Sequence, residues 1–412
     1  MKTLRFITAG NVDDGKSTLI GRLLYDSDSI HTDQLGVLQK QTKQEGVAID
    51  LSLITDGLRA EREQGITIDV AYKYFSTKNR KFIIADAPGH EQYTRNMITG
   101  ASNSDLIIIL VDARKGITEQ TKRHASIGSL MGIQKAILAV NKIDLVNYSE
   151  DIFNQIKTDF ESLKSELNYK EIVYIPLSAL AGDNVVTKSE FTPWYNGKAL
   201  LQILEEIEID STINLVSRFQ VQWVIRPKDE KYHDYRGYAG LVLSGSYEIG
   251  DKVSILPVSI ETRILKIEKN NIEVEKAIAG ENVVLHFENN IDISRGDTIV
   301  KKGEFPITST QILTWISWLD NSELQLGKTY LLQHRFKTVR VKIQSIDQKW
   351  NINDWEFVPA TSIKLNDIAQ VTLKTNQPLF YDTFADNPKS GNAILIDETS
   401  FNTVGALMFL EN

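Results

Sequence analysis

Apolar and polar positions in the first half of the chain follow the alternating pattern of buried strands and amphipathic helices. Short, largely apolar runs predict strands at residues 4–9, 82–85, 136–140 and 172–176. Apolar residues with the 3.6-residue period of a helix are found at residues 17–25, 118–131, 151–167 and 200–209. Strands that alternate with helices in this way predict an α/β fold with a doubly wound, mainly parallel sheet.

The pattern changes near residue 210, where helical periodicity gives way to short runs rich in Val, Ile, Thr and Tyr. A first set of predicted strands covers residues 219–225, 238–244, 252–257, 260–268, 282–287 and 298–300. A second set covers residues 308–319, 329–336, 338–347, 368–374, 393–397 and 404–409. Many short strands between turn residues are typical of antiparallel barrels. The sequence therefore predicts an α/β domain at residues 1–212 and two antiparallel β-barrel domains at residues 213–302 and 303–412.

Composition narrows the class of protein. The 412 residues carry a formal net charge of −8 and include no cysteine. The acidic balance argues against non-specific nucleic-acid binding, so no nucleic-acid partner is expected. The lack of cysteine excludes disulfides and Cys-based metal sites. No apolar run approaches the roughly 20 residues of a membrane-spanning helix, and no signal peptide precedes the first strand, so we expect a cytoplasmic protein without membrane association.

The loop between the first predicted strand and helix has the pattern of a phosphate-binding loop. It reads GNVDDGKST at residues 10–18 and matches Gly-x-x-x-x-Gly-Lys-Ser. Gly10 and Gly15 let the backbone curl so that N–H groups point at phosphate oxygens, and the helix N-terminus adds partial positive charge. Lys16 is expected to reach the terminal phosphates, and the Ser17 hydroxyl to bind Mg²⁺. The predicted nucleotide contacts here are Gly10, Asn11, Val12, Asp13, Asp14, Gly15, Lys16, Ser17 and Thr18.

A second motif, DAPGH at residues 86–90, directly follows a predicted strand. The Asp86 carboxylate is expected to hold Mg²⁺ through water at the end of that strand. Gly89 lacks a side chain, so its N–H can approach the terminal phosphate closely. The predicted contacts in this motif are Asp86, Ala87, Pro88, Gly89 and His90.

A third motif, NKID at residues 141–144, points to the base of the nucleotide. Guanine presents two neighbouring N–H donors where adenine presents none, and the Asp144 carboxylate can accept both. Lys142 is expected to lay its stem along the base, and Asn141 to tie this loop back to the phosphate loop. The predicted base contacts are Asn141, Lys142 and Asp144.

A fourth motif, SAL at residues 178–180, follows the last predicted strand of the α/β domain. The Ala179 N–H is a candidate donor to the guanine O6 atom, and the predicted contacts are Ser178, Ala179 and Leu180. Such a tripeptide alone is typical of an ordinary loop. Four motifs in this order, each after an apolar strand, predict a GTP-binding domain.

The remaining chemistry falls on residues 61–70, which read EREQGITIDV. Thr67 is the candidate second protein ligand of Mg²⁺, so the predicted metal ligands are Ser17, Thr67 and Asp86. His90 is expected to orient or polarise the attacking water, and the predicted catalytic residues are His90, Lys16 and Thr67. The sequence places no arginine as an internal charge-stabilising group, so intrinsic hydrolysis is expected to be slow and a partner could add about 10³–10⁵-fold in rate.

These motifs, followed by two β barrels, resemble the translational GTPase superfamily, in its elongation-factor-like group. Within it, the chain resembles the GTPase subunits of bacterial ATP sulfurylase, the sulfate adenylyltransferase subunit 1 family. The barrel segments that carry this resemblance read IRPKDEKYHDYRGYAG at residues 225–240 and IDISRGD at residues 291–297. The resemblance implies GTP and Mg²⁺ as cofactors and a separate catalytic ATP sulfurylase subunit (subunit 2) as partner. That subunit would make adenylyl sulfate and pyrophosphate from ATP and sulfate, and GTP hydrolysis here would drive this uphill reaction.

A second function stays open at this point. A translation factor that delivers aminoacyl-tRNA or a release factor to the ribosome would have the same nucleotide motifs. The acidic balance and the segment at residues 225–240 favour the sulfurylase subunit.

Overall fold

The computed structural model describes residues 3–27, 51, 70–88, 94–163, 167–209, 215–227, 235–351 and 356–411. The chain divides into two compact units. Met1–Ile209 supplies the body of the first, and the second consists of Asp210–Asn351 and Glu356–Asn412. The domain boundaries predicted at residues 212 and 302 stay predictions.

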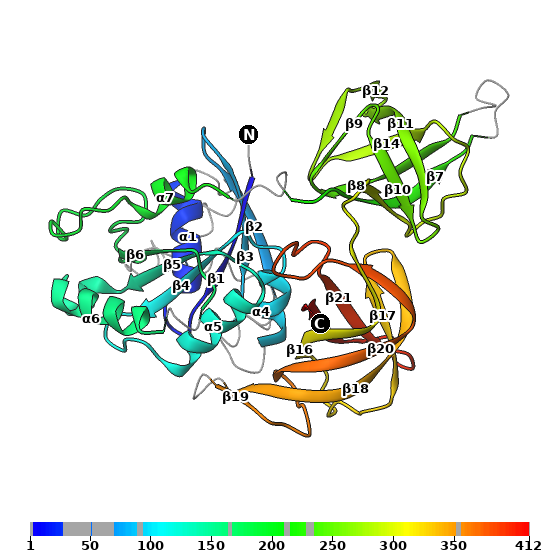
Figure 1. Cartoon of the computed structure of the whole chain (residues 1–412). Helices are drawn as coiled ribbons and strands as arrows, with labels where there is room; N and C mark the ends of the chain where they lie inside the picture. Colours follow the sequence, from blue (N-terminus) through cyan, green and yellow to red (C-terminus); the bar gives the residue numbers. More distant parts are fainter. Residues whose placement is uncertain are drawn as a thin grey trace. The chain divides into compact units, whose positions relative to one another are not determined.

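A mainly parallel sheet forms the centre of the first unit (Figure 1). Its strands are β1 (Thr3–Ala9), β2 (Ala71–Ser76), β3 (Lys81–Asp86), β4 (Leu106–Asp112), β5 (Lys135–Asn141) and β6 (Glu171–Pro176). Their order across the sheet is β2-β3-β1-β4-β5-β6, and within the described residues only β2 runs antiparallel to its neighbour. Every residue of β4 is buried, as expected for a central strand covered on both faces.

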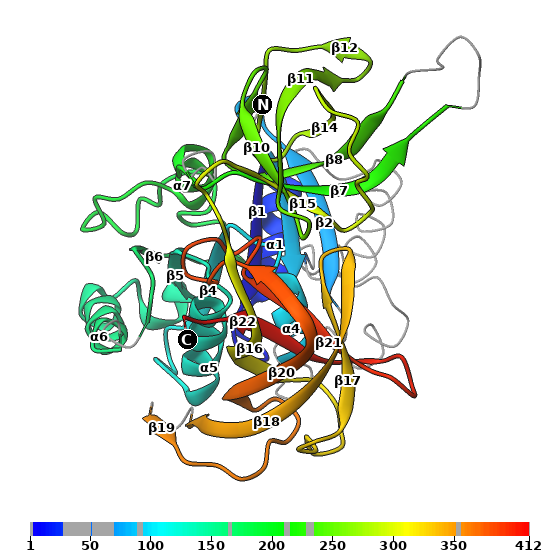
Figure 2. The same cartoon turned by 45° about the vertical axis from the view of Figure 1, so that its right-hand side comes forward.

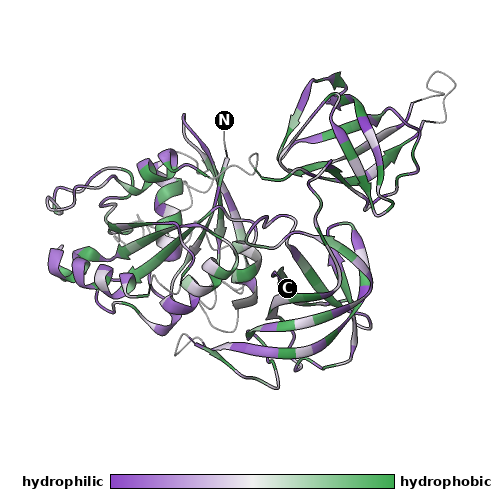
Figure 3. Cartoon of the chain, viewed as in Figure 1, coloured by the Kyte–Doolittle hydropathy of each residue, from purple (hydrophilic) through white to green (hydrophobic). Residues whose placement is uncertain are grey.

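Helices cover both faces of this sheet (Figures 1 and 2). The described helices are α1 (Lys16–Asp26), α4 (Thr94–Ala101), α5 (Glu119–Leu130), α6 (Glu150–Glu161), α7 (Leu200–Glu206) and the short 3₁₀ helix η3 (Ile143–Val146). Apolar residues of α1 and α7 share one core cluster with the strands, whereas α4 and α5 pack on the other face. Figure 3 shows apolar residues gathered on the strands, while α6 mixes polar and apolar positions. The predicted doubly wound α/β fold is confirmed.

Two predicted helices end earlier than their apolar pattern indicates. Helix α6 ends at Glu161. The prediction extended it to residue 167 because Leu167 is apolar, and Leu167 is indeed buried, but it lies outside the helix. Helix α7 ends at Glu206, and the buried Arg80 guanidinium donates to carbonyl groups at that end of the helix. Arg80 Nη1 lies 3.1 Å from the carbonyl oxygen of Leu204 and 2.6 Å from that of Ile207.

The second unit begins with a closed antiparallel barrel. Its strands in the described residues are β7 (Arg218–Ile225), β8 (Gly237–Ser244), β10 (Lys252–Leu256), β11 (Ile260–Lys269), β14 (Asn282–Phe287) and β15 (Thr298–Lys301). They follow the order β10-β15-β7-β8-β14-β11, and pairing of β10 with β11 closes the ring. Three short strands that the sequence did not predict accompany them: β9 (Ser246–Glu248), β12 (Ile272–Glu273) and β13 (Lys276–Ile278).

A second closed antiparallel barrel follows, and its long strands lie side by side in both views (Figures 1 and 2). The described strands are β16 (Ile307–Trp318), β17 (Thr329–His334), β18 (Lys337–Asn351), β20 (Ile368–Tyr381), β21 (Asn392–Asp397) and β22 (Thr403–Phe409). Their order is β17-β21-β22-β16-β20-β18, closed by the β17–β18 pair, with β19 (Glu356–Val358) added beside β18. Both predicted barrels are thus confirmed.

Buried polar contacts join the two barrels within the second unit. Arg218 of β7 forms a two-pronged ion pair with Asp382, with Nε–Oδ2 and Nη2–Oδ1 distances of 3.0 and 2.7 Å. Asn387 donates to the Ser244 hydroxyl at 2.8 Å.

No helix among the described residues is long and apolar enough to span a membrane.

Candidate functional site

The phosphate loop lies between β1 and α1, at the edge where the parallel strands end. Its backbone turns through left-handed conformations at Asp13 (φ 68°) and Gly15 (φ 94°). A β-carbon at Gly15 would overlap the Asn141 side-chain amide, so only glycine fits there. In the described structure no side chain caps the start of α1. The first N–H groups of the helix are therefore directed at the space where an anion would lie.

Lys16 is buried at the first position of α1. Its Nζ donates to the carbonyl oxygens of Gly10 at 2.9 Å and Asn11 at 3.0 Å. Burial lowers the pKa of Lys16, and the nearby carboxylates of Asp86 and Asp14 oppose that shift. The ammonium group is thus held across the loop, close to acidic groups and to the N–H groups that start the helix.

Side chains of the loop fix its first half. Asp14 Oδ2 accepts the Asn11 N–H at 2.7 Å, and Asn11 Oδ1 accepts the Val12 N–H at 2.8 Å. Burial raises the pKa of Asp14 above its ordinary value. Because these two N–H groups already have partners, the groups left for phosphate belong to the second half of the loop and the start of α1. The nucleotide contacts predicted for Asn11 and Val12 stay predictions.

The proposed metal position lies at the end of β3. Asp86 is buried as the last residue of that strand, beside Thr8 of β1, whose hydroxyl donates to it at 3.4 Å. Ala87 and Pro88 follow and are also buried. In the described part of the chain no three His, Cys, Asp or Glu side chains gather as a metal cage. Mg²⁺ is usually held by one or two carboxylates together with substrate phosphates, and the Asp86 carboxylate is a ligand of this type.

Three predicted residues, Thr67, Gly89 and His90, lie outside the described residues. Their assigned roles in metal binding, phosphate contact and water activation stay predictions. Ser17 and Thr18 lie in the first turn of α1, next to Lys16.

Asn141, the last residue of β5, joins two loops of the site. Its Nδ2 donates to the Asp14 carbonyl at 2.7 Å, which confirms the predicted tie to the phosphate loop. Its Oδ1 accepts the Ala179 N–H at 2.9 Å. The sequence had assigned this N–H to the guanine O6 atom, and the structure gives it another partner. Ala179 therefore supports Asn141 here, and its predicted donation to the guanine O6 atom stays a prediction.

Lys142 crosses from the NKID loop to the phosphate loop. It adopts a left-handed conformation (φ 61°), and its Nζ donates to the Asp13 carbonyl and lies 3.1 Å from Asp112 Oδ2. Asp112 ends β4 and also binds Arg114, with Nε–Oδ1 and Nη2–Oδ2 distances of 3.0 and 2.7 Å. Burial alone would raise the pKa of Asp112, but hydrogen bonds from Arg114 and Lys142 outweigh it and hold the pKa well below its ordinary value. The Lys142 side chain is thereby held between the phosphate loop and the end of β4, and its contact with the base stays a prediction.

Asp112 is a site residue that the sequence reasoning missed. A carboxylate directly after a buried apolar run, at the same edge as Asp86 and Asn141, was the available signal.

Asp144, the predicted acceptor for the base, has an unsatisfied carboxylate oxygen. Its Oδ1 atom is buried and has no hydrogen-bond partner among the described residues. A buried carboxylate oxygen without a donor is costly unless a ligand supplies one. The paired N–H donors of guanine match this need.

The SAL loop is anchored from helix α1. Arg22 Nε donates to the Ala179 carbonyl at 3.2 Å, and its Nη2 donates to the Leu180 carbonyl. The Ser178 hydroxyl accepts the Ala181 N–H at 3.2 Å, and the Leu180 side chain is exposed. The loop is therefore held through its backbone, by Arg22 on one side and by Asn141 on the other.

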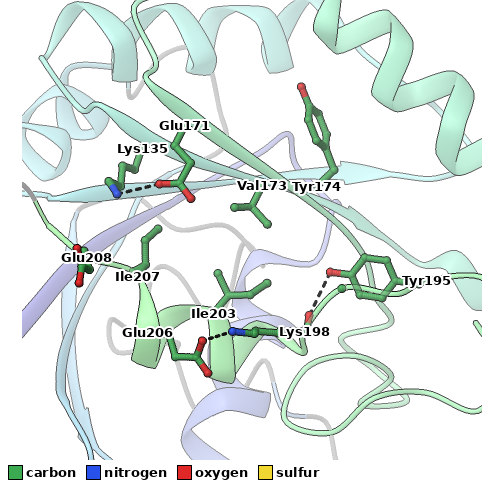
Figure 4. Close-up of a pocket in the computed structure, with 11 residues that line it drawn as sticks. Lys135, Glu171, Val173, Tyr174, Tyr195, Lys198, Ile203, Glu206, Ile207 and Glu208 are labelled. Carbon is green, nitrogen blue, oxygen red and sulfur yellow. Dashed lines mark hydrogen bonds and ion pairs between the residues drawn. The ribbon is translucent and has the colours of Figure 1, made fainter.

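A separate cavity of about 550 Å³ lies between β6 and α7 (Figure 4). It is lined by residues at the start of β5 and β6, where Lys135 Nζ pairs with Glu171 Oε2 at 2.8 Å, and by α7 residues such as Ile203. The parallel strands begin there, at the sheet edge opposite the four motifs, and no motif residue lines it. The cavity is therefore not part of the nucleotide site.

The chain is similar to known GTPases along most of its length. Residues 1–214 match the family model of the elongation factor Tu GTP binding domain, and residues 311–409 match one described as GTP-eEF1A C-terminal domain-like. The Saccharomyces cerevisiae Ski7 GTPase-like domain, solved with bound GTP, superposes with a TM-score of 0.52 at 18% identity and covers 100% of this chain and 97% of its own. That likeness supports the fold alone.

Two curated relatives are much more similar in sequence. Sulfate adenylyltransferase subunit 1 of Alteromonas mediterranea is 47% identical over 412 residues, which cover 99% of this chain and 87% of the relative. The bifunctional enzyme CysN/CysC of Mycobacterium tuberculosis is 47% identical over 413 residues, which cover 99% of this chain and 67% of the relative. The chain therefore belongs to the sulfate adenylyltransferase subunit 1 family, within the translational GTPase superfamily.

Proposed function

We propose that this chain is the GTP-hydrolysing subunit of a sulfate adenylyltransferase and acts in sulfate assimilation. On a separate catalytic subunit, a sulfate oxygen would replace pyrophosphate at the α-phosphorus of ATP and form adenylyl sulfate. The phosphosulfate anhydride so formed is less stable than the bond broken in ATP, so the reaction needs a driving force. GTP hydrolysis on this chain supplies it through a conformational cycle. The observation that carries the proposal is 47% identity to sulfate adenylyltransferase subunit 1 along 99% of the chain.

Separate residues of the site bind the phosphates and the base of GTP. Lys16 and the uncapped start of α1 bind the phosphates, and Asp144 accepts the donors of guanine. Bound Mg²⁺ would neutralise phosphate charge as hydrolysis proceeds. Ser17 and Asp86 are proposed to hold it together with Thr67, on the sequence pattern.

His90 is proposed to orient the water that attacks the terminal phosphate. The proposal depends on its place in the DAPGH motif, one residue after Gly89. With no internal arginine assigned to the transition state, the catalytic subunit is the expected source of acceleration, by about 10³–10⁵-fold.

The partner and the compartment belong to this proposal as well. We propose a complex with subunit 2 of the sulfate adenylyltransferase, in the cytoplasm. A role as a translation factor is disfavoured, because the family similarity runs through both barrels as well as the GTPase domain.

The proposed function is tested by purifying the chain together with its catalytic subunit and measuring pyrophosphate release from ATP and sulfate. We expect release to depend on GTP and to lose that dependence in a Lys16→Ala complex, in which phosphate binding is removed. Equal release with and without GTP would contradict the proposal. Co-purification of tRNA in place of the catalytic subunit would favour the translation factor.

A further inference from the structure

The two residues that follow the turn bearing Asp144 have left-handed backbone conformations. Helix η3 carries Asp144, and the next two residues, Asn147 and Tyr148, both have positive φ values, 53° and 54°. Side chains other than glycine rarely adopt this conformation, so other contacts must stabilise it. The Asn147 N–H donates to the Asp144 carbonyl at 3.2 Å, and the Tyr148 N–H donates to the Ile143 carbonyl at 2.8 Å. The turn that bears Asp144 is thus closed by the backbone of Tyr148.

The side chain and carbonyl of Tyr148 hold this turn from the outside. Its hydroxyl donates to Asp183 Oδ2 at 2.9 Å, and its carbonyl accepts the Trp194 indole N–H at 3.0 Å. Its ring stacks on Phe191 with ring centroids 4.9 Å apart. Burial, helped by Asp183, raises the pKa of Tyr148 to about 12, so the hydroxyl stays a donor at physiological pH.

Asp183 extends the connection to the other loop of the base site. Its carbonyl accepts the Ser178 N–H at 3.1 Å, and its Oδ1 accepts the Ser189 hydroxyl at 2.7 Å. Ser178 begins the SAL loop, whose next residue bonds to Asn141. The Tyr148–Asp183 hydrogen bond therefore spans from the turn that bears Asp144 to the loop that supports Asn141.

We propose that Tyr148 is a positioning residue for guanine recognition: its hydroxyl, through Asp183, sets the place of the Asp144 carboxylate. This inference rests on the proposed function, because it assumes that Asp144 reads the base. Asp144 has a buried oxygen with no partner of its own among the described residues, so the surrounding turn must hold it in place. Tyr148 is the residue that both closes this turn and anchors it to a second loop.

The test compares Tyr148→Phe, which removes the hydroxyl and keeps the stacked ring, with the unchanged chain. Dissociation constants are measured for GTP and for inosine triphosphate, which lacks the exocyclic amine that one Asp144 oxygen would accept. We expect GTP affinity to fall by about 3- to 10-fold, the loss expected when one hydrogen bond of typical strength is removed. Inosine triphosphate keeps only the N1–H donor to Asp144, so its affinity is expected to fall less than that of GTP, and the preference for guanine narrows.

The matched control is Tyr235→Phe, which removes another tyrosine hydroxyl that donates to a carboxylate, Glu268 Oε2, at 2.6 Å. Tyr235 belongs to the first barrel, so the loss of its hydroxyl is expected to leave the affinities for GTP and for inosine triphosphate unchanged. Asp183→Asn retains an acceptor oxygen for Tyr148 and is expected to retain most of the preference for guanine.

The possible outcomes distinguish the positioning role of Tyr148 from the proposed function. An unchanged GTP-to-inosine preference in Tyr148→Phe would overturn the positioning role while leaving the proposed function intact. An equal loss for both nucleotides, together with a lower melting temperature, would also overturn it, because that pattern indicates a structural role only. If the unchanged chain itself binds ATP as tightly as GTP, the proposed function fails, and this inference with it.

Discussion

Asn141 connects the phosphate loop and the SAL loop through two buried hydrogen bonds, and its replacement by alanine should disturb both. One bond satisfies the Asp14 carbonyl at 2.7 Å, and the other satisfies the Ala179 N–H at 2.9 Å. The Asn141 side chain is 1% exposed. Asn141→Ala would therefore leave one acceptor and one donor without partners in the interior.

The magnitude follows from these two groups. A buried polar group left unsatisfied costs about 1–3 kcal/mol, so the variant is expected to lose about 2–6 kcal/mol in all. Because nucleotide binding requires both loops to be in place, we assign about half of this loss to binding. With a factor of ten for each 1.4 kcal/mol, GTP affinity should fall by about 5- to 140-fold. The rest should lower the free energy of unfolding of the first unit.

The assay combines fluorescent-nucleotide binding with urea unfolding, each measured for the unchanged chain, Asn141→Ala and a control. The control is Asn79→Ala, because the Asn79 amide donates at 3.1 Å to the exposed Glu205 carboxylate. We expect the control to stay within twofold in affinity. If Asn141→Ala bound GTP within threefold of the unchanged chain and unfolded at the same urea concentration, the reasoning on the two loops would be refuted.

Three further predictions concern catalysis, the joint between the barrels, and pH. His90→Ala should slow single-turnover GTP hydrolysis by about 10²-fold or more while GTP affinity stays nearly unchanged; a large loss of affinity with unchanged chemistry would assign His90 a structural role. Arg218→Ala leaves the Asp382 carboxylate buried and without its ion-pair partner, and should lower the free energy of unfolding by about 3–5 kcal/mol. Its control, Arg340→Ala, breaks an exposed ion pair and should lower it by less than about 1 kcal/mol. Equal losses in the two variants would contradict this contrast. Burial lowers the pKa of His334 to about 4, so between pH 6.5 and 4 the unfolded chain binds more protons than the folded one and stability falls as pH falls. His334→Gln should flatten that slope in unfolding measured across this range, and an unchanged slope would show that other groups cause it.

The fold could be predicted from the sequence wherever a strand or helix has a local pattern. The apolar runs at residues 82–85 and 136–140 and the turn residues between the barrel strands are such patterns, and the tie from Asn141 to the phosphate loop followed from two strand ends at one sheet edge. The three short strands of the first barrel had no such pattern. Each is only two or three residues long and depends on pairing with a distant partner, as β13 pairs with β9.

The site could be predicted in its motifs, but the contacts between them depend on the fold. Nothing local in the sequence indicates that Lys142 pairs with Asp112, since these residues come together only at the ends of neighbouring strands. The hydrogen bond from the Ala179 N–H to Asn141 was missed for the same reason. Its bond to Asn141 follows from how two loops pack, and the motif alone carries no information on it.

The central claim is that one pocket selects guanine through Asp144, and nucleotide competition tests it most directly. GTP, ATP and xanthosine triphosphate are allowed to compete for the unchanged chain and for Asp144→Asn. A pocket built on hydrogen bonds to the base should prefer GTP over ATP by about 10⁴-fold or more. Asp144→Asn should shift the preference toward xanthosine triphosphate, which presents a carbonyl where guanine presents an amine. Equal binding of ATP and GTP by the unchanged chain, or unaltered GTP selectivity in the variant, would contradict the account.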